Sequence, residues 1–159
     1  MKVQIVNFEP KYEDAFRELN YEWINKYFEV ETSDQQMLED PQGYIIGRGG
    51  FIFVGLMDGK PVGVCALVKG ERWELAKMAV SPVAQGKGLG WHLGKAVIDK
   101  AKELGVGTLF LETNSILEPA IRLYKKLGFE EITGCESPYA RCNVQMELVM
   151  DEPGERECI

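Results

Sequence analysis

The sequence is poor in the residues that bind metals. It has a single histidine, His92, and four cysteines, which are Cys65, Cys135, Cys142 and Cys158. No two of the cysteines stand in a Cys-x-x-Cys pair, and such pairs, combined with histidines, are typical of zinc sites. We therefore expect no bound metal, and we interpret all four cysteines as free thiols in a reducing compartment.

Long hydrophobic runs and an excess of positive charge are also missing. No apolar run among the 159 residues is long enough to span a membrane, and residues 1–4 do not resemble a signal peptide. The formal net charge is −7, whereas nucleic-acid binding depends on cationic contacts to phosphate. We expect a cytoplasmic protein that binds neither membranes nor nucleic acid. Its charge serves solubility and also fits a cationic small-molecule partner.

The spacing of apolar residues predicts one mixed α/β domain over residues 1–150, followed by a polar tail at 151–159. The expected order is β-α-α-β-β-β-α-β-α-β-β, a mixed (α+β) sheet with helices on both faces. Expected strands occupy 3–8, 51–57, 62–68, 72–80, 108–113, 130–133 and 142–150. Expected helices occupy 10–27, 89–104 and 118–127, with a short helix that Thr32 or Ser33 caps and that Pro41 and Gly43 end.

The stretch Val80–Gly90 joins an expected strand to an expected helix through a glycine-rich loop. Such a loop aims unpaired backbone N–H groups and the positive end of a helix dipole at one point, which attracts an anion, most often a phosphate. Glycines at 86, 88 and 90 allow the backbone to approach a ligand closely, and Lys87 adds a cation.

Two common phosphate-binding loops do not fit this stretch. The ATP/GTP loop, G-x-x-x-x-G-K-[ST], requires glycine where Ser81 stands and Ser or Thr where Gly88 stands. The dinucleotide fingerprint, G-x-G-x-x-G, requires a third glycine where Trp91 stands. The pattern that remains is Gln85-x-x-Gly88-x-Gly90.

Three segments together resemble the GNAT superfamily of N-acetyltransferases: Glu74–Pro82, Gln85–Gly90 and Leu123–Phe129. The expected element order is similar to that of the family as well, and the resemblance covers about residues 3 to 150. It implies the acyl-CoA N-acyltransferase fold, in which strands four and five, here 74–80 and 107–113, diverge after a bulge. Acetyl-CoA is then expected to lie between the two splayed strands.

The resemblance also implies roles for individual residues. Backbone groups of Met78, Ala79 and Val80 are expected to pair with the pantetheine arm of acetyl-CoA. The N–H groups of the loop are expected to hold its pyrophosphate, through Gln85, Gly86, Lys87, Gly88, Leu89 and Gly90. Loop amides at a helix N-terminus suit a diphosphate on physical grounds too. Many members also use an asparagine three residues before a helix alanine, but this chain has Leu117 there, and Asn114 is expected to replace it.

Two further residues carry over as the acid and the base. Tyr124 is expected to protonate the departing CoA thiolate, the alternative being a core tyrosine whose hydroxyl reaches the surface. Glu74 is expected to deprotonate the amine, since a buried carboxylate has a raised pKa. The alternative for Glu74 is a strand-end residue paired with Lys77 or Arg72, and Glu112 is a second candidate base for which a structural role is preferred.

The resemblance implies an N-acetyltransferase that moves an acetyl group from acetyl-CoA to a primary amine by direct attack in a ternary complex. An amide of Met78 or Ala79 is expected to stabilise the oxyanion. We place the acceptor site between Trp23 and Glu39 and in the loop 134–141. The acidic and aromatic groups of the first region suit an ammonium group, namely Tyr27, Glu29, Glu31 and Asp34. A solvated helix junction is the alternative for that region.

Other functions stay open at this point. The same fold supports a non-catalytic acetyl-CoA sensor, a transferase that uses another acyl-CoA, or one with a hydroxyl acceptor. Many relatives are dimers, so the resemblance also implies a homodimer.

Overall fold

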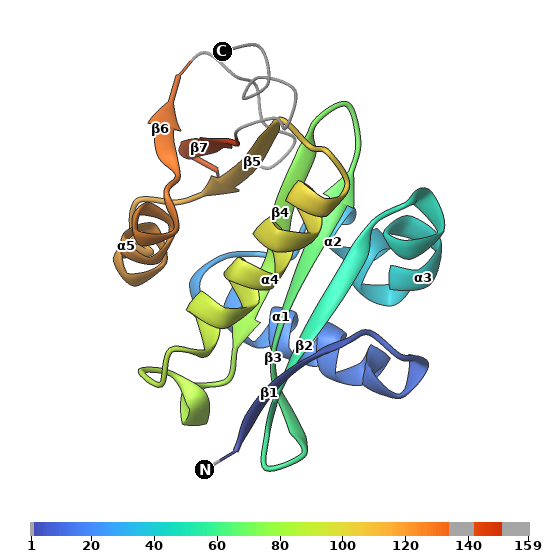
Figure 1. Cartoon of the computed structure of the whole chain (residues 1–159). Coiled ribbons are helices and arrows are strands. Elements are labelled where there is room, and N and C mark those ends of the chain that lie inside the picture. Colours follow the sequence, from blue (N-terminus) through green and yellow to red (C-terminus); the bar gives the residue numbers. More distant parts are fainter. Residues whose placement is uncertain (1, 134–141, 151–159) are drawn as a thin grey trace.

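A seven-stranded mixed sheet forms the centre of the computed structural model, which describes residues 2–133 and 142–150 (Figure 1). The order of the strands across the sheet is β1-β2-β3-β4-β5-β7-β6. The pairing of β4 with β5 is parallel, and the other five are antiparallel. The strands are β1 Val3–Asn7, β2 Phe51–Met57, β3 Lys60–Lys69, β4 Trp73–Val80, β5 Thr108–Thr113, β6 Glu130–Ile132 and β7 Val144–Val149.

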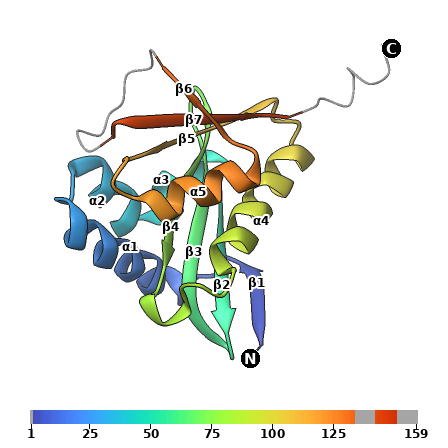
Figure 2. The same ribbon diagram turned by 90° about the vertical axis from the view of Figure 1, so that its left-hand side faces the viewer.

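Helices cover both faces of the sheet (Figures 1 and 2). One face carries α1 Glu13–Tyr27, α2 Thr32–Glu39 and α3 Pro41–Tyr44, and the other carries α4 Leu89–Glu103 and α5 Glu118–Leu127. Short 3-10 turns occupy Pro10–Tyr12, Ile46–Arg48 and Pro82–Ala84. Because strand side chains alternate between faces, the buried residues form two clusters. One cluster includes Phe16, Leu38 and Val64, and the other includes Cys65, Leu93 and Met146.

The predicted order of elements and the two-faced sheet are confirmed, with three local corrections. The short helix ends at Glu39, before Pro41 as expected, but a further helix, α3, begins at Pro41, where the Asp40 side chain accepts a hydrogen bond from the N–H of Gly43 at 2.9 Å. The N-cap of α2 is Glu31, not Thr32 or Ser33, and it forms a capping box with Asp34. β7 begins at Val144, two residues later than expected. The predicted loop 134–141 and tail 151–159 lie outside the described residues.

Two glycines in the central strands allow the start of α4 to pack closely on the sheet. A Cβ atom placed on Gly55 of β2 would lie 2.7 Å from Leu89, and one on Gly63 of β3 would lie 2.9 Å from it. These distances are shorter than van der Waals contact, so the missing side chains let Leu89 pack against the backbone. The packing fixes the first turn of α4, and with it the glycine-rich loop that precedes the helix.

The parallel ladder between β4 and β5 is very short. It consists of Trp73 opposite Leu109 and Glu74 opposite Phe110. Beyond Glu74 the strands separate, and Figure 2 shows β5 and β7 running at a steep angle to β4. The predicted splaying of strands four and five is confirmed.

A β-bulge in β4 lies where the separation begins. On the β3 side, Ala76 lies opposite Ala66 and Ala79 lies opposite Val64. Two residues of β4, Lys77 and Met78, therefore lie opposite a single residue of β3. Lys77 has a φ of +55°, in the left-handed region that favours glycine. The bulge turns the rest of β4 away from β5.

Leu93 of α4 tests the packing that holds this helix in place. Its side chain is fully buried, so Leu93→Ala should lower the free energy of unfolding by about 2–5 kcal/mol. Leu104 follows the same helix and is 44 % exposed, so Leu104→Ala is the matched control, with an expected loss under about 1 kcal/mol. Urea unfolding followed by circular dichroism measures both, and equal losses would contradict the packing described above.

Candidate active site

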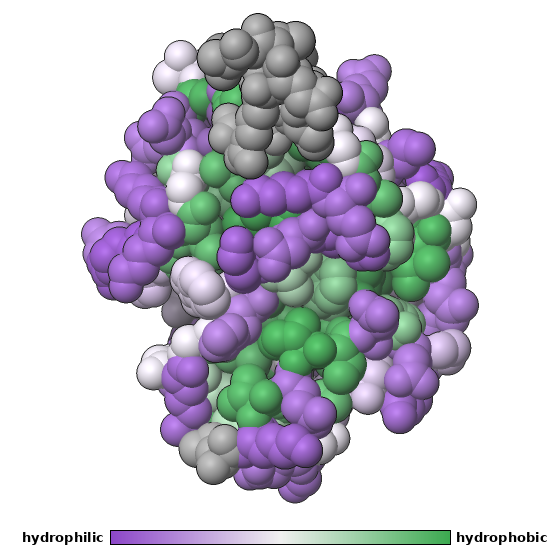
Figure 3. All heavy atoms as spheres, viewed as in Figure 1, coloured by the Kyte–Doolittle hydropathy of each residue, from purple (hydrophilic) through white to green (hydrophobic). Residues whose placement is uncertain are grey.

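The separation of β4 from β5 opens a cleft of about 780 Å³. Its walls come from β4, the loop and first turn of α4, the end of β5, and α5, with three aromatic residues of the α1 region on one side. Figure 3 shows an indentation of the surface between α5 and the loop after β4. The cleft is lined by these predicted site residues: Glu74, Met78, Ala79, Val80, Gln85, Gly86, Gly88, Leu89, Gly90, Asn114 and Tyr124. Lys87 is exposed and does not line it.

The glycine-rich loop presents backbone N–H groups at the N-terminus of α4. Gly86 and Gly88 have φ values of +78° and +79°, which other residues adopt only with strain, and Gly88 is the N-cap. The N–H of His92 donates to the carbonyl of Gly88. The N–H groups of residues 86–91 donate to no acceptor within the described part of the chain. A row of such donors at the positive end of a helix dipole can bind an anionic group.

The free edge of β4 offers a second set of backbone groups. Ala79 and Val80 pair with Val64 and Gly63 of β3, on one side of the strand. On the β5 side, the ladder ends at Glu74, so this edge has no strand partner further along. An extended ligand that carries amides can add to such an edge as another strand does.

Tyr124 of α5 reaches the cleft from the opposite wall. It is buried, and its ring packs edge-on against Phe129 at 6.2 Å between ring centroids. Burial raises the pKa of the Tyr124 hydroxyl well above its ordinary value, and a nearby Cys65 thiol acts in the same direction. The hydroxyl is therefore protonated at neutral pH, which is the state that a proton donor needs.

Glu74 lies at the end of the β4–β5 ladder, on the floor of the cleft. The pKa of its carboxyl is raised from 4.5 to about 7, mainly by burial and then by the negative charge of Glu112, against the opposing positive charge of Lys77. Glu112 accepts a hydrogen bond from the Gln145 amide at 3.3 Å. A carboxyl that titrates near neutral pH can take and release a proton under physiological conditions.

The alternative pairing of Glu74 with Lys77 or Arg72 finds no support in the positions of those cations. The Lys77 ammonium lies 2.7 Å from a carboxylate oxygen of Asp34. The Arg72 guanidinium stacks 4.7 Å from the ring centroid of Phe110.

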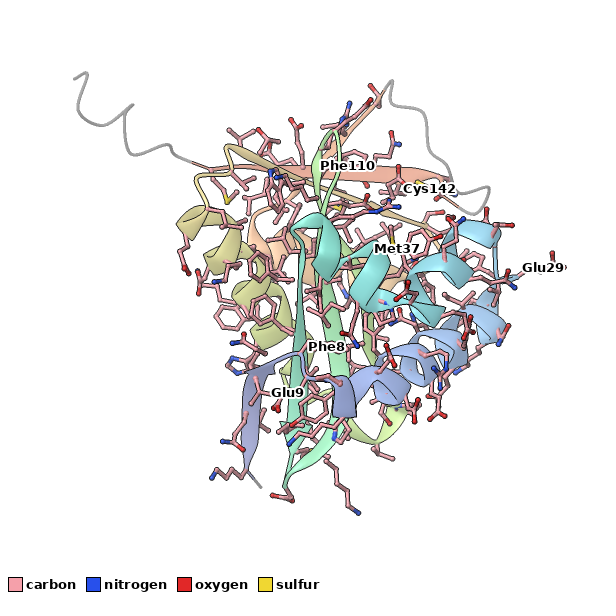
Figure 4. All side chains as sticks on the ribbon, turned by 90° about the vertical axis from the view of Figure 1, so that its right-hand side faces the viewer. Phe8, Glu9, Glu29, Met37, Phe110 and Cys142 are labelled. Carbon is pink, nitrogen blue, oxygen red and sulfur yellow. The ribbon has the colours of Figure 1, made fainter. Side chains whose placement is uncertain are left out.

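The predicted acceptor region divides into residues that line the cleft and residues that do not. Trp23, Tyr27 and Phe28 line it. The acidic members were placed there wrongly. Asp34 is fully buried and paired with Lys77, and Glu29 points away from the body of the protein (Figure 4). Glu31 is occupied as the N-cap of α2. The physical reason for Glu31 and Asp34 is that the capping box at the start of α2 uses both carboxylates for its own backbone. The other part of the predicted site, 134–141, lies outside the described residues.

Two cations and one tryptophan that line the cleft were not predicted from the sequence as site residues. Arg122 and Lys126 of α5 line the cleft one helical turn apart, and Trp91 lines it from the first turn of α4 with 40 % of its surface exposed. The spacing of four residues between two cations on a helix was the available signal. These side chains add positive charge and an aromatic surface to the lining of the cleft.

Comparisons with known proteins agree with this geometry. The family model of the GNAT acetyltransferases matches residues 17–129, and the chain belongs to this family. The uncharacterized N-acetyltransferase YjgM of Escherichia coli is 34 % identical over 108 residues, which are 66 % of this chain and 58 % of that protein. The chain spans about half of the length of the curated relatives that it matches.

Two solved structures show the same fold. An acetyltransferase of the GNAT family from Staphylococcus aureus has a TM-score of 0.85 at 20 % identity, over 94 % of this chain and 100 % of that one. An acetyltransferase from Salmonella typhimurium, solved with its cofactor acetyl-CoA, has a TM-score of 0.73 at 21 % identity, over 96 % of each chain. Within residues 2–133 and 142–150, no helix is long and apolar enough to cross a membrane, and no metal-binding group of His, Cys, Asp or Glu gathers.

The raised pKa of Glu74 predicts how stability depends on pH. The folded state binds the Glu74 proton more tightly than the unfolded state, so the free energy of unfolding should fall as pH rises from about 4.3 to 7. The loss attributable to this group is up to about 3 kcal/mol and is complete above pH 7. Glu74→Gln should remove it, so the variant gains stability relative to the natural protein at pH 8 but not at pH 4.

Urea unfolding between pH 4 and pH 8 measures this difference. Glu112→Gln provides a second variant, because the charge of Glu112 contributes to the raised pKa of Glu74. In Glu112→Gln the free energy of unfolding should still fall with rising pH, but over a narrower pH range than in the natural protein. A Glu74→Gln variant whose stability follows the same pH curve as the natural protein would contradict the assignment.

Proposed function

We propose that this protein is an N-acetyltransferase that moves an acetyl group from acetyl-CoA to a primary amine by direct attack within a ternary complex. The observation that carries the proposal is the cleft itself. It joins a row of free loop amides, a free strand edge, a protonated tyrosine and a carboxyl that titrates near neutral pH. Acetyl-CoA has the matching chemistry: a pyrophosphate, an arm with two amides, and a thioester.

The residues of the cleft fit acetyl-CoA as follows. The amides of Gly86, Gly88 and Gly90, with the first turn of α4, would hold the pyrophosphate. Arg122 and Lys126 add charge to that end. The edge of β4 at Met78, Ala79 and Val80 would pair with the pantetheine arm. Acetyl-CoA supplies an activated acetyl thioester, and the remaining chemistry falls to the protein.

Each step of the transfer has a candidate residue. Glu74 accepts a proton from the substrate ammonium, directly or through water, so that the amine nitrogen can attack the thioester carbonyl carbon. An amide of Met78 or Ala79 donates to the carbonyl oxygen as negative charge develops there. As the carbon–sulfur bond breaks, Tyr124 gives its proton to the sulfur. The nitrogen loses its second proton as the carbon–sulfur bond breaks, and this proton restores Tyr124 through water. The products are an N-acetyl amine and CoA, and the proton on Glu74 returns to solvent.

Two alternatives share this site. A non-catalytic acetyl-CoA sensor would need the loop and the strand edge but neither Glu74 nor Tyr124, so the presence of both in the cleft favours the enzyme. A transferase for another acyl-CoA, or for a hydroxyl acceptor, would use the same residues. Asn114 as a cofactor contact, a cationic acceptor, a homodimer and a cytoplasmic location stay predictions.

A CoA-release assay tests the proposal. The purified protein is incubated with acetyl-CoA and a panel of polyamines, amino acids, aminoglycosides, and peptides with free N-termini or lysines. Amine-dependent release of CoA is expected with at least one class. Tight acetyl-CoA binding by calorimetry without release on any amine would favour the sensor.

Gly88→Glu tests the loop. The substitution places a carboxylate where the pyrophosphate is expected, so affinity for acetyl-CoA should fall at least about 100-fold in calorimetry. Gly105→Glu is the matched control, because Gly105 ends α4 with a φ of +78° and, like Gly88, has no atom within 4 Å of an added Cβ. Both variants carry the same backbone strain, and only Gly88→Glu should lose the ligand. Unchanged affinity in Gly88→Glu would remove the loop from the site.

Tyr124→Phe tests the proton donor. Removal of the hydroxyl should lower kcat roughly 100-fold and change KM for acetyl-CoA much less, because the group acts only as the thiolate leaves. Tyr12→Phe is the matched control, since Tyr12 is 8 % exposed, against 7 % for Tyr124, and packs in the other core. If kcat of Tyr124→Phe stays within twofold of the natural value, the tyrosine has no part in the mechanism.

A further inference from the structure

A buried ion pair in the wall of the cleft plays no direct part in the steps above. The ammonium of Lys77 in β4 lies 2.7 Å from a carboxylate oxygen of Asp34 in α2, and the two side chains are 4 % and 0 % exposed. Removing two charges from water offsets most of what their attraction gains, so such a pair adds little net stability. What the pair does provide is a fixed distance between a helix and a strand that are 43 residues apart in the chain.

Lys77 is also the residue in the β4 bulge with the unusual backbone. Its φ of +55° lies where glycine is the ordinary occupant, yet the chain has lysine there. The carbonyl of Lys77 accepts a hydrogen bond from the Asn20 side chain at 3.3 Å, and the same amide donates to the carbonyl of Phe16 at 3.0 Å. The bulge is therefore tied to α1 through its main chain and to α2 through the lysine side chain.

The partner at the other end of the pair is fixed as well. The second carboxylate oxygen of Asp34 accepts a hydrogen bond from the N–H of Glu31 at 3.0 Å, within the capping box of α2. Asp34 therefore cannot turn away without releasing the start of its own helix. The Lys77 ammonium is therefore paired with a carboxylate whose position is fixed.

We propose that Lys77 is a positioning residue, which with Asp34 holds the β4 bulge so that the amide of Met78 faces the acyl group. This inference rests on the proposed function, since it concerns the oxyanion donors of that reaction. Lys77 lines the cleft, but its ammonium is engaged by Asp34 and it acts through the backbone that it holds. A misplaced donor weakens transition-state stabilisation even when the substrate still binds.

The proposal predicts a division between binding and turnover. The loop at residues 86–90 is held by the packing of Leu89 on Gly55 and Gly63, and the edge of β4 beyond the bulge is held by the pairing of Ala79 and Val80 with β3. Loss of the pair should therefore leave the dissociation constant for acetyl-CoA within about threefold of the natural value. It should lower kcat at least tenfold, because the donors to the carbonyl oxygen are no longer held. If the pair only stabilised the fold, its loss would not lower kcat while the dissociation constant for acetyl-CoA stayed nearly the same.

The main test replaces the whole pair, with Lys77→Met and Asp34→Leu in one protein. Two apolar side chains of similar size leave no uncompensated buried charge. The control is Lys95→Met with Asp99→Leu, which removes an ion pair of 3.2 Å on the exposed side of α4. Lys77→Arg keeps a cation beside Asp34 and should retain kcat within threefold. Lys77→Met with Asp34→Asn, which also removes both charges and keeps an acceptor for the N–H of Glu31, serves in place of the double variant if that protein does not fold.

Three measurements on folded protein decide the outcome: kcat, the calorimetric affinity for acetyl-CoA, and amide hydrogen exchange at Met78 and Ala79. The proposal expects a lower kcat, a nearly unchanged affinity and faster exchange in the double variant or in its Asp34→Asn replacement. It is overturned if kcat stays within threefold of the natural value, if exchange is unchanged, or if the control pair behaves in the same way.

The same experiment separates this inference from the proposed function. If the natural protein binds acetyl-CoA but releases no CoA with any amine, the proposed function fails. Hydrogen exchange then still shows whether the ion pair holds the bulge.

Discussion

The parallel ladder between β4 and β5 ends after Glu74, and most of the site follows from that interruption. Two strands that continued side by side would satisfy each other's backbone groups and leave no room between them. The bulge at Lys77 and Met78 turns β4 aside instead, so one strand edge faces a cleft and not a neighbouring strand. Such an edge needs a partner that offers amides in an extended arrangement, which the arm of acetyl-CoA does.

The electrostatics of the cleft differ from those of the chain as a whole. The formal net charge is −7, yet the lining of the cleft combines the N-terminus of α4 with two cations of α5, Arg122 and Lys126. The floor near β5 carries two carboxylates, Glu74 and Glu112. Burial and the negative charge of Glu112 raise the pKa of Glu74 to about 7. One cleft thus favours an anion at one end and proton transfer at the other.

The parts of this structure that follow local sequence rules could be predicted from the sequence, and those that depend on distant contacts could not. Apolar periodicity located the strands and helices, and the glycines before α4 located the loop, because each depends on neighbouring residues. The position of the bulge carried no such signal, since a lysine and not a glycine takes the positive φ. The partnership of Lys77 with Asp34 was also hidden, because it joins residues 43 positions apart. For the same reason Asp34 was assigned to a substrate-facing cluster when it lies buried.

The hydrogen-bond donors of the cleft are largely main-chain N–H groups, so evolution constrains them differently from the side chains that line the rest of it. Every residue except proline carries the same N–H group, so most replacements along the free edge of β4 leave the donors in place. In the loop after β4, by contrast, the positive φ values favour glycine at positions 86 and 88. The aromatic wall formed by Trp23, Tyr27 and Phe28 consists of side chains, and each replacement there alters the shape of the cavity. Replacements in this wall can therefore change the shape of the cleft while the main-chain donors along the edge of β4 stay the same.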